Sequence, residues 1–162
     1  MASGNSLLTF GPLASEPPSA NYATLDLRNA HPVLDFDAAT DESVSFSSIL
    51  PAHYAGGGLT LKIHWTATSA TSGDVVWNGE IEAISGLDID ADSFATAQAV
   101  TGTANGTSGI ETVSTITFSS GANMDSLAAG GAFRLRITRD ANNGSDTLVG
   151  DAEVLYLELL ET

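Results

Sequence analysis

Residues 59–82, LTLKIHWTATSATSGDVVWNGEIE, bring a histidine, a lysine, two tryptophans and three acids close together. In 59–67 the odd positions are apolar and the even positions polar, and 75–83 again carries its tryptophan on an odd position. Such period-2 alternation is typical of β-strands, whose successive side chains point to opposite faces. The stretch therefore predicts two strands that the SATSG turn (69–73) joins into a β-hairpin.

The register of this hairpin follows from matching its two faces. The arrangement that sets apolar against apolar and polar against polar gives three cross-strand pairs: Trp65–Trp77, Lys62–Glu80 and His64–Asn78. A slip of one residue would destroy this matching of the two faces. A catalytic role for His64 would need a nucleophile or a pocket on its face, where the neighbours are threonines. A structural hairpin is therefore the preferred interpretation.

Similar short alternating runs, separated by Gly, Pro, Asn and Asp, recur along the chain. They predict strands at 22–28, 43–49, 59–67, 74–84, 94–100, 110–119, 132–139 and 152–160, with 33–37 as a candidate ninth. The helical signal is limited to a turn or two at 124–129. About eight strands at this spacing predict an all-β fold with a single antiparallel β-sandwich of jelly-roll topology, and an immunoglobulin-like sandwich is the second choice. We expect residues 1–20, which contain three prolines, to form an extended N-terminal arm, and residues 21–162 to form the sandwich domain.

Composition excludes several classes of function. The 162-residue chain has no cysteine, so disulfides, thiolate zinc sites and thiol nucleophiles are ruled out. It has 20 acids against 5 bases, a formal charge of −15, which argues against nucleic-acid binding. Its apolar runs are too short for a membrane span, and its first residues lack the pattern of a signal peptide. We therefore expect synthesis in the cytoplasm, no export by a standard signal and no membrane partner.

The run LDIDADSF (87–94) is the one candidate for a metal site. Asp88, Asp90 and Asp92 alternate like the first half of a calcium loop. An EF-hand would need glycine and glutamate where the sequence has Ser93 and Ala99. The sequence thus predicts no cofactor and a solvated loop, and a structural Ca²⁺ held by the three aspartates stays open as the alternative.

Catalytic motifs are missing or incomplete. Asp35 and Asp37 share one face of a short strand, and paired carboxyls could serve glycoside hydrolysis, but alternation does not fix their separation. The glycine-rich segment 50–59 lacks the lysine of a phosphate loop, and no serine stands in a nucleophile elbow. We assign no catalytic residue and predict that the protein is not an enzyme. The remaining alternative for the function is a small hydrolase that uses the acids near 31–42 or 88–92.

The final run, VLYLELL (154–160), is apolar on both faces except for Glu158. A strand of this kind is either central and covered or part of a subunit interface. We favour the interface, with arginines that could pair with acids such as Glu153 and Glu158. The candidate interface residues are Val154, Tyr156, Leu160, Arg134 and Arg136.

Three pieces of the sequence, HPVLDFD (31–37), LPAHYAGGGLTL (50–61) and WTATSATSGDVVW (65–77), carry a resemblance to a known group. They resemble small jelly-roll structural proteins of tailed bacteriophages, over roughly a third of the chain. The resemblance implies a virion protein without catalytic residues. The first expectation from it is a homotrimeric capsid decoration (cement) protein that binds the major capsid protein or another virion surface. The alternative is a carbohydrate- or receptor-binding β-sandwich module of a tail fibre or spike, with Trp65, Trp77 or Tyr54 as a stacking platform.

Overall fold

The alternating segments form ten strands in the computed structural model, which describes residues 4–162. Two 3-10 helices, η1 (Pro12–Ala14) and η2 (Ala122–Met124), lie between strands. The strands are β1 (Ser6–Phe10), β2 (Thr24–Arg28), β3 (His31–Phe36), β4 (Glu42–Ile49), β5 (Leu59–Ala67), β6 (Asp74–Ala83), β7 (Gln98–Thr103), β8 (Thr112–Phe118), β9 (Ala132–Arg139) and β10 (Ala152–Glu161). The predictions for 59–67 and 132–139 are confirmed to the residue, whereas β7 begins later than predicted. At 124–129 the predicted helix does not continue beyond η2, because Asp125 and Ser126 adopt left-handed φ angles of 51° and 57°.

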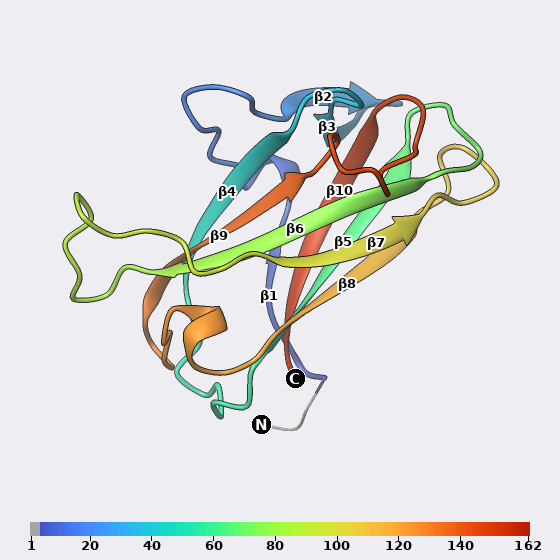
Figure 1. Cartoon of the computed structure of the whole chain (residues 1–162). Coiled ribbons are helices and arrows are strands. Elements are labelled where there is room, and N and C mark those ends of the chain that lie inside the picture. Colours follow the sequence, from blue (N-terminus) through green and yellow to red (C-terminus); the bar gives the residue numbers. More distant parts are fainter. Residues whose placement is uncertain (1–3) are drawn as a thin grey trace.

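The strands form two antiparallel sheets that face each other (Figure 1). The first, which we call sheet A, has the order β2-β3-β10-β5-β8, and β1 also pairs with β10. The second, sheet B, has the order β4-β9-β6-β7. The side chains between them form one apolar core, in which Leu59, Leu61 and Ile63 of β5 are fully buried. The predicted all-β sandwich is confirmed, with two strands more than the expected eight.

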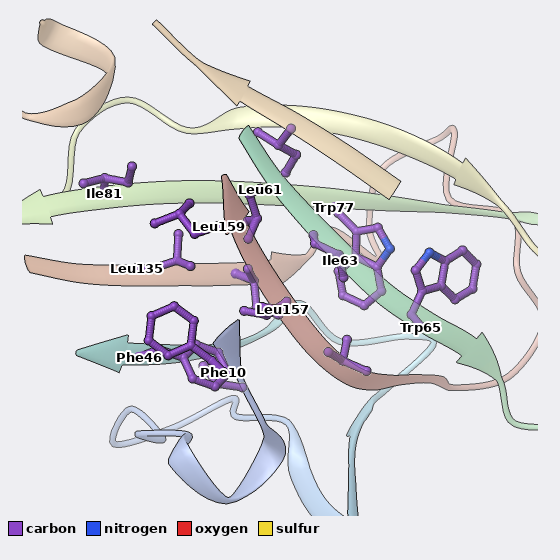
Figure 2. Packing of buried hydrophobic residues seen from close by; sticks show 14 of the residues in the cluster. Phe10, Phe46, Leu61, Ile63, Trp65, Trp77, Ile81, Leu135, Leu157 and Leu159 are labelled. Carbon is purple, nitrogen blue, oxygen red and sulfur yellow. The ribbon is translucent and has the colours of Figure 1, made fainter. Parts of the chain in front are cut away.

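The predicted hairpin is wrong, because β5 and β6 belong to opposite sheets. β5 pairs with β10 and β8, whereas β6 pairs with β9 and β7. The two tryptophans still meet, but across the core: their ring centroids lie 5.9 Å apart at an interplanar angle of 66° (Figure 2). The polar residues of the expected hairpin therefore have other neighbours: Lys62–Glu158, Glu80–Arg136 and His64–Tyr156.

Part of the expected N-terminal arm lies within sheet A. β1 pairs with the second half of β10, and Phe10 is buried against Phe46 at a centroid distance of 5.4 Å. The Gly4 N–H donates to the carbonyl of Glu161 at 2.7 Å, and the Glu161 N–H donates to the carbonyl of Asn5 at 3.0 Å. The start of the described chain, just before β1, and the end of β10 consequently lie side by side (Figure 1). Residues 1–3 of the predicted arm lie outside the described residues.

β10 is the central strand of sheet A, flanked by β5 on one side and by β3 and β1 on the other. A β-bulge between Val154 and Tyr156 adds Leu155 to the strand and shifts the alternation. Val154 therefore faces the core, while Tyr156 lies on the outer face, 44% exposed. Strict alternation had placed Val154, Tyr156 and Leu160 on one face, and this part of the prediction is wrong. The sequence left two alternatives for this strand, a covered central strand or part of a subunit interface. Within the chain, the first of them describes β10.

Arg139, the last residue of β9, is a buried cation. Its side chain follows the inward parity of Phe133, Leu135 and Ile137 and is 0% exposed. It forms a bidentate pair with Asp146, at 2.8 Å (Nη2–Oδ1) and 3.1 Å (Nε–Oδ2). It also donates to the carbonyls of Phe36, Gly150 and Leu148 at 3.0–3.2 Å. All five N–H donors of the guanidinium are thus satisfied, which fixes the loop between β9 and β10 onto the sandwich.

Among the described residues, no helix has the length and apolar character that a membrane crossing requires.

Candidate functional site

Tyr156 is the exposed aromatic residue on the outer face of sheet A. The bulge at Leu155 turns its side chain outward, beside His64 of β5. The Tyr156 and His64 rings stack with centroids 4.4 Å apart and an interplanar angle of 27°. The His64 ring therefore covers one face of the phenol ring and holds its orientation. The exposed part of Tyr156 is a fixed, flat apolar surface.

Glu111, just before β8, holds this stack in place. Its Oε1 interacts with Nδ1 of His64 and accepts a hydrogen bond from the Tyr156 hydroxyl at 3.2 Å. Burial, followed by the negative charge of Glu111, raises the pKa of Tyr156. The phenol is therefore protonated at neutral pH and can serve as the donor.

A depression of about 520 Å³ lies next to Tyr156 on the same face. Its apolar lining comes from buried Pro12 of η1, buried Val33 of β3 and half-buried Leu155 of the bulge. Its polar lining comes from Arg28, Asn29, His31 and Thr66. A mostly apolar hollow with a few polar groups is the usual form of a small-ligand site.

The turn between β2 and β3 presents two of these polar residues. Asn29 and Ala30 have positive φ angles of 47° and 66°, as a two-residue type I′ turn requires. The left-handed region costs a non-glycine residue about 1–2 kcal/mol. Asn tolerates it better than Ala, so the strain is concentrated at Ala30. This strained turn places the side chains of Asn29 and His31 at the rim of the depression.

Arg28 ties together the elements that surround the depression. Its Nη1 donates to Oε2 of Glu153 at 2.5 Å and to the carbonyl of Ala67 at 2.9 Å. Its Nη2 donates to Oγ of Ser108 at 3.1 Å, in the loop before β8. Three segments distant in sequence are thereby held to β2, and the positive charge of Arg28 is offset by Glu153.

Carboxylates give this face of sheet A a negative potential. Asp35 lies directly opposite Glu153 in the β3–β10 ladder. Burial, and then the charges of Asp151 and Glu153, raise the pKa of Asp35 to about 6. Asp37 behaves differently: the backbone N–H groups of Ala39 and Thr40 donate to it at 2.6 and 2.7 Å, and its pKa is lowered. Neither aspartate lines the depression.

The three aspartates of the LDIDADSF run lie in the loop between β6 and β7. There the Asp90 N–H donates to Oδ1 of Asp88 at 3.1 Å, and the Ser93 N–H donates to Oδ1 of Asp92 at 2.9 Å. These carboxylates thus cap local backbone groups. In residues 4–162, no group of three or more acidic or histidine side chains is arranged to hold a metal ion.

The candidate interface residues separate onto different surfaces. Val154 and Leu160 are buried within the chain, and Tyr156 belongs to the outer face of sheet A. Within the chain the arginines do not pair with Glu153 or Glu158, because β9 lies in sheet B. Pairing across subunits, the other form of this prediction, stays a prediction. Arg134 contacts Glu82 at 3.2 Å, and Arg136 forms a bidentate pair with Glu80 at 2.6 and 2.7 Å. The Phe94 ring lies 4.1 Å from the Arg136 guanidinium.

The aromatic platforms expected from the sequence are not the exposed ones. Trp65 and Trp77 are 0% exposed and Tyr54 is 6% exposed. Tyr156 was predicted only as an interface residue. No sequence pattern marked Arg28, Asn29 and Glu111 as site residues, because they come together only through strand order and loop placement.

No protein-family model and no curated protein sequence matches the chain. Among solved structures, a family 35 carbohydrate-binding module from an environmental isolate matches with a TM-score of 0.55 and 12% identity, over 94% of this chain and 92% of that one. The CBM22-1 xylan-binding domain of Xyn10C from Paenibacillus barcinonensis also gives 0.55, with 8% identity over 100% and 98%. A cycloisomaltooligosaccharide glucanotransferase from Paenibacillus sp. gives 0.52 and 13% over 96% of this chain, which spans 18% of that enzyme.

These similarities show the fold: the chain is a jelly-roll β-sandwich. The structures reported above belong to carbohydrate-binding modules and a carbohydrate-active enzyme, so the bacteriophage part of the resemblance is without support among them.

Proposed function

We propose that the chain is a non-catalytic carbohydrate-binding module that holds a sugar in the depression beside Tyr156. The observation that carries the proposal is the Tyr156 ring, which is supported on one face by His64 and 44% exposed. An aromatic side chain offers a large apolar face at a small entropic cost, which suits the apolar C–H face of a pyranose. The neighbouring polar side chains of Asn29, His31 and Thr66 can exchange hydrogen bonds with sugar hydroxyls.

The fold gives this proposal a second support. Solved modules with the same sandwich are described as carbohydrate-binding, one of them as xylan-binding. Identities of 8–12% carry the architecture and not the ligand. The choice of the depression therefore rests on the geometry around Tyr156.

Affinity electrophoresis through gels that contain soluble polysaccharides tests the proposal, followed by calorimetry with the best ligand. Tyr156→Ala should weaken binding about tenfold, equivalent to about 1.4 kcal/mol. The matched control is Tyr22→Ala, because Tyr22 is similarly exposed (48%) but lies outside the depression. Thermal unfolding of both variants separates lost binding from lost folding. Equal binding by Tyr156→Ala and the parent protein, or no retardation in any gel, would refute the proposal.

The homotrimer, the capsid partner and the virion location stay predictions from the sequence. Light scattering at micromolar concentration checks the first of them. A strictly monomeric protein at that concentration would count heavily against a decoration role.

A further inference from the structure

The outer face of sheet A holds two cations, and both are already paired. Arg28 donates to Glu153, and Nζ of Lys62 lies 3.5 Å from Oε2 of Glu158. Glu153 and Glu158 are both on β10, so each cation is offset by the strand that carries Tyr156. The remaining bases belong to β9, which lies in sheet B.

Carboxylates that pair with no lysine or arginine of residues 4–162 surround the same face, although Oε1 of Glu111 also contacts Nδ1 of His64. Glu111, with a side chain 40% exposed, contacts the Tyr156 hydroxyl itself. Asp26 is exposed on β2, directly opposite Val33, which lines the depression. Asp35 follows two residues later on β3, where burial, and then the charges of Asp151 and Glu153, raise its pKa to about 6. Each lies on or next to an element that borders the depression, on a molecule of net charge −15.

This arrangement bears on the kind of sugar that could bind. A carboxylate or sulfate on the ligand would meet like charges and would need Arg28 to break its contact with Glu153. Pairs of unit charges a few ångströms apart near a surface interact appreciably, and salt screens them over about 10 Å. Neutral hydroxyls escape this repulsion and can still bond to Asn29, His31 and Thr66.

We infer that the depression selects an uncharged glycan chain and rejects glycans that carry carboxylate or sulfate groups. The inference rests on the proposed function, because it names the ligand class of the same site. The charge pattern would matter little for a site that contacts only one apolar side chain. It matters here because Glu111 both positions the platform and lies beside it.

The test compares two ligands that share one backbone. A hexose polysaccharide from the gel screen is oxidised at its primary hydroxyls to the corresponding polyuronate, whereas a pentosan, which has none, is carboxymethylated to give the acidic ligand in place of the uronate. Calorimetry measures the neutral and the acidic form at 20 mM and 500 mM NaCl. We expect the uronate to bind at least tenfold more weakly at low salt, with a smaller difference at high salt. The neutral ligand should bind equally at both.

Asp26→Lys reverses one charge outside the lining of the depression. At 20 mM NaCl, the substitution should reduce the ratio between the affinities for the neutral and the acidic ligand severalfold. The affinity for the neutral ligand itself should stay unchanged. A uronate that binds the parent protein as tightly as the neutral chain overturns the inference and leaves the proposed function in place. An unchanged difference in Asp26→Lys overturns it as well. If neither ligand binds, the proposed function itself fails.

Discussion

Replacing Arg139 by methionine should cost the fold more than replacing any other cation in the described part of the chain. Methionine keeps much of the apolar stem but leaves the buried Asp146 carboxylate, 1% exposed, without its partner. Three backbone carbonyls also lose a donor. Breaking a buried ion pair on one side costs about 3–5 kcal/mol. For a domain of this size each kcal/mol lowers Tm by about 2–4 °C, so we expect a fall of about 6–20 °C.

The measurement is urea unfolding followed by far-UV circular dichroism, because Trp77 pairs with Arg139 across the β6–β9 ladder and its fluorescence would report local change. The matched control is Arg136→Met, on the same strand but on the outer face. Its pair with Glu80 is partly exposed, so its loss should cost about 1 kcal/mol or less.

A double-mutant cycle with Asp146→Asn isolates the interaction between the two side chains. Residues in direct contact couple by about 0.5–3 kcal/mol, and we expect a value in the upper part of that range. A loss below about 1 kcal/mol for Arg139→Met, or strictly additive effects of the two substitutions, would refute the view that this cation fixes the β9–β10 loop.

Four further substitutions test the fold around the depression and the core. The raised pKa of Asp35, about 6 against an ordinary 3.8, means that the folded state binds this proton more tightly than the unfolded state, so its contribution to stability is greatest below pH 3.8 and is lost as pH rises to 6. The pKa shift is equivalent to about 3 kcal/mol, which solvent screening reduces to about 1 kcal/mol because Asp35 is partly exposed. Asp35→Asn should therefore stabilise the protein at pH 7 by about 1 kcal/mol and should have little effect near pH 3. Asp37→Asn should act in the opposite direction, because the pKa of Asp37 is lowered. Ala30→Gly should raise the free energy of unfolding by about 0.5–1 kcal/mol, because glycine adopts φ 66° without strain, and a loss of stability in urea would contradict the assigned turn. Gly102→Ala should cost about 1–3 kcal/mol, since its Cβ would lie 2.0 Å from Oγ of Ser114, the acceptor of the Trp65 indole hydrogen bond; a crystal structure with Ser114 unmoved would show that the backbone gives way instead.

The strands of this fold could be predicted, but their partners could not. Alternation placed Trp65 and Trp77 inward, and both are buried. Two inward residues can meet either across a ladder or across the core, and alternation is the same in both cases. The SATSG segment (69–73) is long enough to cross from one sheet to the other, so the hairpin was only one of two ways to satisfy the pattern.

Two misses had a signal in the sequence and one did not. The parity of Phe133, Leu135 and Ile137 continues to Arg139, so a buried arginine could have been expected at this position. The short run Ser6–Phe10 ends in a phenylalanine that the core needs. The bulge at Leu155 has no local signature, because glycine is absent there and the extra residue is itself apolar.

The candidate site could be predicted only in part, since it depends on the bulge and on three loops. The sequence marked Tyr156 only as an interface candidate in an apolar strand. Its exposure, its support by His64 and its neighbours Asn29 and His31 follow from the strand order β3-β10-β5, which no local pattern specifies.

The pairing of β1 with β10 has a practical consequence for attaching the protein to something else. The backbone hydrogen bonds between Gly4–Asn5 and Glu161 put both chain ends at one pole of the sandwich. Five residues of β10 lie between Tyr156 and Thr162, and these six residue steps span about 20 Å along the strand. A tether at either end should therefore leave the depression free to meet its ligand.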